Sequence, residues 1–146
     1  MQGKILWCGM AQKNIKRTTG CPVAFGLDIF GDRWTLIIIR DIMIKGIRTY
    51  SGFLESDEKI ATNILVDRLK LLEAEGIVEK SRDPENRRSF IYTLTQKGRE
   101  LAPVLIEIIK WSGVYDTRPF ALKETSGRIR KDRQAFEYGL LNNTSN

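Results

Sequence analysis

Cys21 is the residue in this sequence best suited to covalent chemistry. It stands directly before Pro22 at the expected start of a helix, where unpaired N–H groups and the positive end of the helix dipole favour a thiolate over a thiol. A thiolate attacks peroxides, quinones and other thiols, so Cys21 is a candidate redox or electrophile sensor. The alternative is a small apolar residue packed in the core, because free cysteine is among the most buried residue types. Cys8 is the weaker candidate and could pair with Cys21.

Histidine, the commonest general base and metal ligand, is absent from the 146 residues. Its absence excludes Ser-His-Asp triads, Cys-His dyads and HExxH zinc sites. The two cysteines form no CxxC pair, which excludes a zinc site of the usual ligand count, and the sequence has no P-loop, GxGxxG or GxSxG motif. A thiol enzyme would have to activate Cys21 without a histidine. We therefore expect no enzyme, with no catalytic residue and no metal.

Basic residues outnumber acidic ones, 24 Lys plus Arg against 18 Asp plus Glu, which gives a net charge of +6. Such a surplus favours a polyanionic partner, either nucleic acid or an anionic membrane surface. The longest apolar run, Leu36 to Ile39 with Ile42 to Ile44 beyond two charged residues, is far shorter than the roughly 20 residues that span a bilayer. The stretch from Ile5 to Cys8 is too short for the apolar region of a signal peptide. We therefore expect a cytoplasmic protein whose partner is nucleic acid and which does not bind membranes.

Apolar spacing and capping residues predict four helices in the first half of the chain. Asp32 and Thr49 are suited to cap two of them, and Pro22 suits the first turn of another. The second helix is apolar nearly all round and should lie in the centre of the core. Gly76 follows the fourth helix in the position that favours a left-handed residue. The expected spans are 22–30, 32–45, 50–55 and 61–75.

A β-hairpin is expected next, because 77–81 and 89–95 are rich in β-branched and aromatic residues. The segment between them is basic and contains the turn formers Pro84 and Asn86. The hairpin should therefore have a basic tip.

A long helix capped by Thr95 should follow and continue to about Val114, with Pro103 producing a kink near its start. Beyond it, one amphipathic piece is expected from Ile129 to Leu140. The role of this C-terminal region stays open between a dimer arm, a DNA contact and disorder. The predicted parts of the chain are a basic N-terminal arm over 1–20, a winged helix-turn-helix DNA-binding and dimerisation domain over 21–114, and a C-terminal extension over 115–146.

The order of these elements is that of a winged helix-turn-helix, so the expected fold class is mainly α with a small β-hairpin (α+β), and terminal helices form a dimer. In this fold the helix expected over 61–75 presents its first turns to base edges in the major groove. Asn63 could bond adenine bidentately, Thr62 a base edge or a phosphate, and Val66 a thymine methyl. We predict these three as base-reading residues. Arg68 lies toward the buried side of the helix and is expected to form a structural ion pair or to pack its stem on the core, rather than to contact DNA.

Contacts to phosphate or to the minor groove are predicted for basic residues on the same helix and on the hairpin, because arginine at a hairpin tip suits either contact. They are Lys70, Lys80, Arg82, Arg87 and Arg88. The alternative is that a charged tip is only a solvated turn, and that Asn63 is an ordinary surface residue.

An apolar stripe on the last long helix predicts the dimer interface at Leu105, Ile108 and Trp111, because it is larger than one small domain can cover. A single recognition helix reads few base pairs. We therefore expect a homodimer on a palindromic operator in double-stranded DNA, with half-sites roughly 34 to 36 Å apart.

The chain resembles the HxlR-type family of winged-helix regulators over about Cys21 to Trp111. Residues 21–23 (CPV) and 31–36 (GDRWTL) resemble its opening motifs, 60–78 its recognition-helix segment, and 92–99 its exit strand and final helix cap. The resemblance implies a homodimer, no cofactor, and regulation of nearby genes in response to stress or small molecules. Some members of that family use the cysteine at this place as a sensor.

The sequence is therefore interpreted as a sequence-specific DNA-binding transcriptional regulator, a repressor that responds to stress, a small molecule or an electrophile through Cys21. Two alternatives stay open. The wing tip over 83–88 is closer to that of MarR-type ligand-responsive regulators, and a winged helix can also serve as a protein-interaction module.

Overall fold

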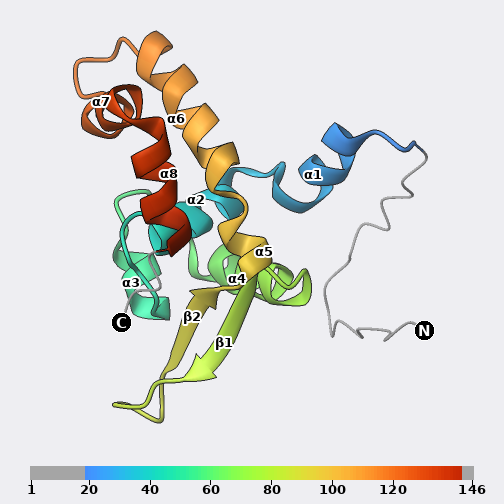
Figure 1. Ribbon diagram of the computed structural model, residues 1–146. Helices are drawn as coiled ribbons and strands as arrows, with labels where there is room; N and C mark the ends of the chain where they lie inside the picture. Colours follow the sequence, from blue (N-terminus) through green and yellow to red (C-terminus); the bar gives the residue numbers. More distant parts are fainter. Residues whose placement is uncertain (1–18, 143–146) are drawn as a thin grey trace.

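The structure, a computed structural model, describes residues 19–142, so Cys8 and nearly all of the expected basic arm lie outside the described residues. In chain order the elements are α1 (Pro22–Phe30), α2 (Arg33–Met43), α3 (Tyr50–Glu55), α4 (Thr62–Ala74), β1 (Val78–Arg82), β2 (Phe90–Leu94), α5 (Gln96–Arg99), α6 (Ala102–Tyr115), α7 (Glu124–Lys131) and α8 (Arg133–Asn142). The two strands form an antiparallel hairpin beside the helices (Figure 1). The expected fold class, a mainly helical winged helix-turn-helix, is confirmed.

Helix α2 runs through the centre of the fold and contacts α1, α4, α6 and β2. Asp32 caps its N-terminus: the carboxylate accepts hydrogen bonds from the backbone N–H groups of Trp34 at 2.8 Å and Thr35 at 3.0 Å. Ile38 and Ile39 are fully buried, as expected for a helix that is apolar nearly all round. The helix ends two residues earlier than the sequence predicts.

Helices α3 and α4 form the helix-turn-helix and pack on each other. Thr49 caps α3 as expected, because its hydroxyl accepts a 3.1 Å hydrogen bond from a backbone N–H of the first turn. Leu65, Leu69 and Leu72 of α4 are buried, which turns the opposite face of this helix outward. Gly76 follows α4 with a φ of +69°, the left-handed conformation predicted for it.

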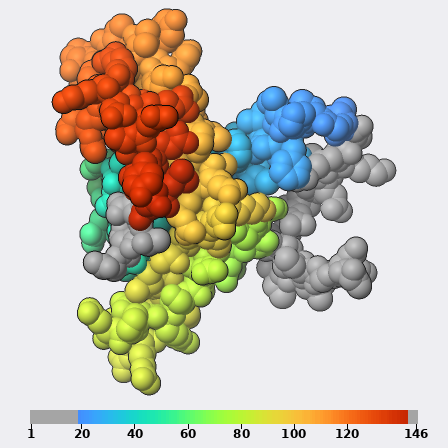
Figure 2. All heavy atoms as spheres, in the orientation of Figure 1, coloured from blue at the N-terminus to red at the C-terminus, as the bar shows by residue number. Residues whose placement is uncertain are grey.

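The hairpin of β1 and β2 projects from the helical body as a separate arm (Figure 2). Each strand begins one residue later than the sequence predicts. Tyr92 of β2 is buried, and its ring meets that of Phe53 in α3 edge-on, with 6.2 Å between centroids. The backbone N–H of Tyr92 also donates to the carbonyl oxygen of Arg48 at 2.8 Å. These contacts attach the base of the hairpin to the helix-turn-helix.

The long helix expected after Thr95 is in fact two helices. Thr95 caps α5, since its hydroxyl accepts a hydrogen bond from the N–H of Gly98 at 3.1 Å, but α5 ends at Arg99 and α6 begins at Ala102. Pro103 in the first turn of α6 explains the interruption, because proline has no N–H to continue the helix and its ring clashes with the carbonyl four residues earlier. The predicted kink is therefore a complete break.

The described part of the extension folds back as α7 and α8, which pack on α6 (Figure 1). Ile129 of α7 and Leu140 of α8 are buried in the same core as α6. The single amphipathic piece expected over these residues is wrong, because the backbone leaves the helical conformation at Asp132. The carboxylate of Asp132 then accepts a hydrogen bond of 2.9 Å from the N–H of Ala135 at the start of α8. This part of the extension belongs to the folded body.

Candidate nucleic-acid interface

The outward face of α4 carries the residues that the sequence predicts to meet DNA from this helix. All four are exposed: Thr62, Asn63, Val66 and Lys70. Ala61 precedes the helix and supplies no side-chain hydrogen bond to it, which leaves backbone N–H groups of the first turn for an external acceptor such as a phosphate. Sequence reasoning missed this backbone contribution, although the lack of a capping side chain at position 61 is its signal.

A groove of about 400 Å³ lies where the start of α2 meets α4. Its lining residues are Asp32, Trp34, Asn63, Ile64, Asp67 and Arg68. Arg68 pairs with Asp67 and, at 3.4 Å, with Asp32, so its predicted structural role is confirmed. Two carboxylates face one guanidinium here, which makes the groove unsuited to phosphate. The sequence could not reveal the groove, because its two walls lie far apart in the chain.

Lys80 and Arg82 of β1 lie over the ring of Phe90 in β2, with their charged groups 4.1 and 4.4 Å from its centroid. These cation–π contacts hold both cations on one face of the hairpin. Arg87 and Arg88 are exposed at the tip, and the Arg82 guanidinium donates to the carbonyl oxygen of Arg87 at 3.0 Å. The structure therefore brings the four predicted wing cations together on the hairpin.

Asn86 shapes the tip, as expected for a turn former. Its side chain donates to the hydroxyl of Ser89 at 3.0 Å and accepts from the N–H of Arg88 at 3.2 Å. Residues 78–90 contain four cations and three carboxylates. The net charge of the hairpin is therefore small. Any attraction of the hairpin to a polyanion must come from where its cations lie rather than from its total charge.

Cys21 lies at the start of α1 and is exposed. The alternative of a buried packing residue is therefore wrong for the single chain. The cysteine side chain makes no capping hydrogen bond, and the first turn of α1 contains no acidic residue. Small oxidants can reach this thiol. Its predicted partner, Cys8, lies outside the described residues.

Apolar side chains are exposed on α1 and on α6. Val23 and Leu27 of α1 face solvent, as do Ile108 of α6, 46% exposed, and Trp111, 67% exposed. Leu105 of α6 is only 5% exposed and belongs to the core of its own chain. Its prediction as a dimer-interface residue is therefore wrong, because a second chain cannot contact a side chain buried in the first.

Within residues 19–142, no helix is long and apolar enough to cross a membrane. In the same range, no three or more His, Cys, Asp and Glu side chains are grouped so that they could hold a metal ion.

Comparison with known proteins connects this surface to one group of regulators. The model of the family described as HxlR-like helix-turn-helix matches residues 29–119, which leaves α7 and α8 outside the match. The chain is 36% identical over 86 residues to YvaP of Bacillus subtilis strain 168, an uncharacterized HTH-type transcriptional regulator. The aligned region covers 59% of this chain and 79% of YvaP.

Solved structures show the same similarity. PA1607, a candidate transcription factor, has a TM-score of 0.64 and 34% identity, with 72% of each chain covered. The redox regulator HypR in its reduced form has a TM-score of 0.58 and 29% identity, and the match covers 66% of this chain and 95% of HypR.

Proposed function

This chain belongs to the HxlR-like helix-turn-helix family and is a transcriptional regulator of that type, and we propose that it acts in the cytoplasm as a homodimeric repressor bound to a palindromic operator in double-stranded DNA. The observation that carries the proposal is the exposed face of α4 beside the cationic hairpin. Buried leucines hold α4 on α2, so its outward side chains are presented from a rigid element.

Each surface has its own task in DNA recognition. Asn63 is the main base-reading residue, because its amide can bond the N6 and N7 edge of adenine, while Val66 can contact a thymine methyl. Thr62 bonds a base edge or a phosphate. The wing cations and Lys70 bind phosphates or enter the minor groove, which supplies affinity for any sequence.

Dimer formation would double the length of DNA that is read. The exposed apolar residues of α6, Ile108 and Trp111, together with those of α1, are the surface that we assign to the partner subunit. A two-fold axis between two such chains places two α4 helices on half-sites roughly 34 to 36 Å apart.

Cys21 is the residue to which we assign the signal. HypR, one of the structural relatives, is a redox regulator, and Cys21 is exposed on α1 beside the proposed dimer surface. Its thiolate would attack a peroxide, forming an S–O bond as the O–O bond breaks and the other oxygen leaves as water or an alcohol after protonation. It would alternatively add to a ring carbon of a quinone. Either product would shift α1 and hence the spacing of the two α4 helices.

Selection from a pool of random duplexes tests the function directly. The wild-type protein should enrich a sequence with two-fold symmetry, and its affinity for the enriched duplex should exceed that for random duplex by a factor of about 1,000 or more. Affinity for both should fall steeply as salt rises. A protein that enriches no sequence and ignores random duplex at low salt would instead be a protein-interaction module.

A further inference from the structure

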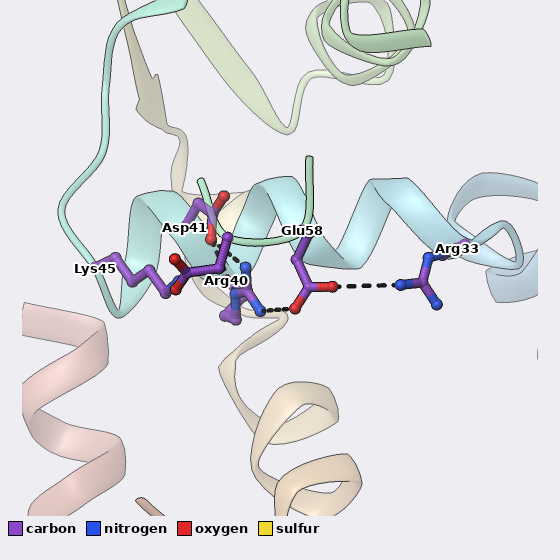
Figure 3. A network of polar contacts seen from close by, with 6 residues as sticks. Arg33, Arg40, Asp41, Lys45 and Glu58 are labelled. Carbon is purple, nitrogen blue, oxygen red and sulfur yellow. Dashed lines mark hydrogen bonds and ion pairs between the residues drawn. The ribbon is translucent and has the colours of Figure 1, made fainter. Parts of the chain in front are cut away.

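The carboxylate of Glu58, in the turn between α3 and α4, bridges two arginines of α2 (Figure 3). One oxygen lies 3.3 Å from Nη2 of Arg33, and the other lies 3.2 Å from Nη1 of Arg40. The two arginines are seven residues apart on α2, which is about two helical turns and places them on the same face. Because each carboxylate oxygen pairs with a different arginine, Glu58 is held at one position along the axis of α2.

Arg40 is itself anchored in the core. Its guanidinium donates to the carboxylate of Asp41 at 2.9 Å from Nε, and Asp41 is buried. The carbonyl oxygen of Asp41 in turn accepts from the N–H of Ile47 at 2.9 Å. The bridge therefore connects the turn to a rigid part of α2 rather than to a freely moving side chain.

The turn leads straight from Glu58 into the reading helix. Lys59 has a φ of 54° and donates its N–H to the carbonyl oxygen of Ser56 at 3.0 Å, which is an unusual left-handed conformation for a residue other than glycine. Ile60 is buried, and α4 begins at Thr62. A displacement of Glu58 would therefore move the first turn of α4, which carries Thr62 and Asn63, two of the three predicted base-reading residues.

We propose that Glu58 is a positioning residue for DNA recognition, whose ion pairs with Arg33 and Arg40 hold the start of α4 at the angle at which it reads bases. This inference rests on the proposed function. It concerns specificity, because a misplaced α4 loses base contacts while the wing still binds phosphates. In this proposal Glu58 acts through the placement of α4 and not through a base contact of its own.

Charge alone predicts a different result, an unchanged ratio between the affinities for specific and random duplexes, and this makes the proposal testable. Removing a carboxylate from a DNA-binding protein should strengthen binding to every duplex, because repulsion of the phosphates falls. Asp57 provides the matched control: it neighbours Glu58 in the same turn, is 91% exposed at its side chain, and pairs with Lys45 at 3.4 Å. Asp57→Asn and Glu58→Gln each remove one negative charge from that turn.

The experiment measures Kd for the duplex enriched by the wild-type protein and for a random duplex of equal length, at one salt concentration, with thermal melting of each variant as a check on folding. We expect Glu58→Gln to reduce the ratio of the two affinities about fivefold, the size expected from losing two partly exposed ion pairs. Asp57→Asn should leave the ratio unchanged. Arg33→Gln removes one of the two ion pairs of Glu58, and the Arg33 side chain is exposed, so this change should lower the ratio by a smaller factor.

An unchanged ratio in Glu58→Gln and in Arg33→Gln would overturn the proposal, whether or not the melting temperature falls, because Glu58 would then act on stability or charge alone. Arg33→Gln decides the matter if Glu58→Gln fails to fold. Failure of the proposed function is distinct, since the wild-type protein would then enrich no duplex and show no ratio to lose.

Discussion

Gly113 of α6 lies so close to Ser126 of α7 that a Cβ at position 113 would stand 2.5 Å from the Cβ of Ser126. Ser126 is buried, and its hydroxyl donates to the carbonyl oxygen of Lys123 at 2.9 Å. The Lys123 ammonium reaches back to the carbonyl oxygen of Gly113 at 3.0 Å. The extension is therefore docked on α6 by a close, specific helix contact that lies partly outside the matched family region.

Gly113→Ala should destabilise the protein, even though alanine favours helix. Inserting a methyl group into this contact is expected to lower the free energy of unfolding by about 1 to 3 kcal/mol. Gly127→Ala is the control: a Cβ there meets nothing within 4 Å, so this change should stabilise α7 by roughly 0.5 to 1 kcal/mol. Urea denaturation of both variants measures the difference, and equal effects at the two positions would show that α7 does not dock as described.

Mutations should separate base recognition by α4 from phosphate binding by the hairpin. Asn63→Ala is expected to cost roughly 1 to 3 kcal/mol on the enriched duplex and to relax base preference. Arg87→Ala and Arg88→Ala should weaken binding to all duplexes alike and reduce the slope of log affinity against log salt by about 1 each. Titrations at several salt concentrations check this. An Arg87→Ala protein with altered base preference and an unchanged slope would contradict the assignment.

Charge on the exposed face of α6 should separate the subunits. Ile108→Glu is expected to weaken dimerisation by about 2 kcal/mol or more, because it places a carboxylate in a desolvated contact. Tyr138→Glu on α8 is the control, since Tyr138 is exposed outside the proposed interface. Analytical ultracentrifugation of both variants measures the dissociation constant. A dimeric, operator-binding Ile108→Glu protein would place the interface elsewhere.

Local signals in the sequence predicted where the helices begin. Asp32 and Thr49 cap the helices that the sequence assigns to them, and Thr95 caps the first of the two helices that replace the expected long one. A cap is predictable because it depends on groups within a single turn. The hairpin was predictable for the same reason, since its turn and strand residues are contiguous in the chain.

Packing between distant segments could not be predicted. Leu105 and Ile108 share one helical stripe, yet the first is buried and the second exposed, because helices elsewhere in the chain decide which edge of a stripe is covered. The bridge from Glu58 to Arg33 and Arg40 is likewise a tertiary contact that periodicity does not encode. Charge patterns alone identify cations and carboxylates, but not which of them meet.

Ionisation of the Asp32 carboxyl should make the free energy of unfolding depend on pH in the acid range. Burial raises the pKa of its carboxyl, but hydrogen bonds from the Thr35 hydroxyl and from the backbone N–H groups of Trp34 and Thr35, with the charge of Arg68, outweigh burial and hold this pKa below its ordinary value of 3.8. A carboxylate whose pKa is lowered by folding contributes stability above its unfolded pKa. That contribution disappears as the pH falls through the lower, folded value.

Asp32→Asn isolates the effect, because asparagine is also a good N-cap. The wild-type protein should exceed this variant in free energy of unfolding at neutral pH, and the difference should shrink once the pH falls below about 3.8. Thermal melting of both proteins across this pH range measures it. A difference that stays constant down to the lowest pH would show that the ionised carboxylate contributes nothing beyond the cap.

Oxidation of Cys21 should release the operator. The thiol is exposed at the start of α1, and the apolar residues Val23 and Leu27 on that helix are exposed beside it, where the proposed partner subunit would pack. Diamide takes two electrons from two thiols and joins them as a disulfide, so Cys21 would need a second thiol, either its counterpart in the other subunit or Cys8. A quinone needs no second thiol, because it adds directly to one sulfur.

We therefore expect wild-type protein treated with a quinone to lose operator affinity, Cys21→Ser to keep it, and Cys8→Ser to behave as wild type. Diamide should act on wild type and fail on Cys21→Ser, and its effect on Cys8→Ser shows which thiol is the partner. Mass spectrometry before and after reduction counts the sulfur atoms modified in each case. If quinone-treated wild type kept full affinity with Cys21 modified, a shift of α1 would be without effect on the spacing of the two reading helices. If Cys21→Ser lost affinity as wild type did, another residue would be the one that reacts. In either case the signal would enter the protein elsewhere than at Cys21.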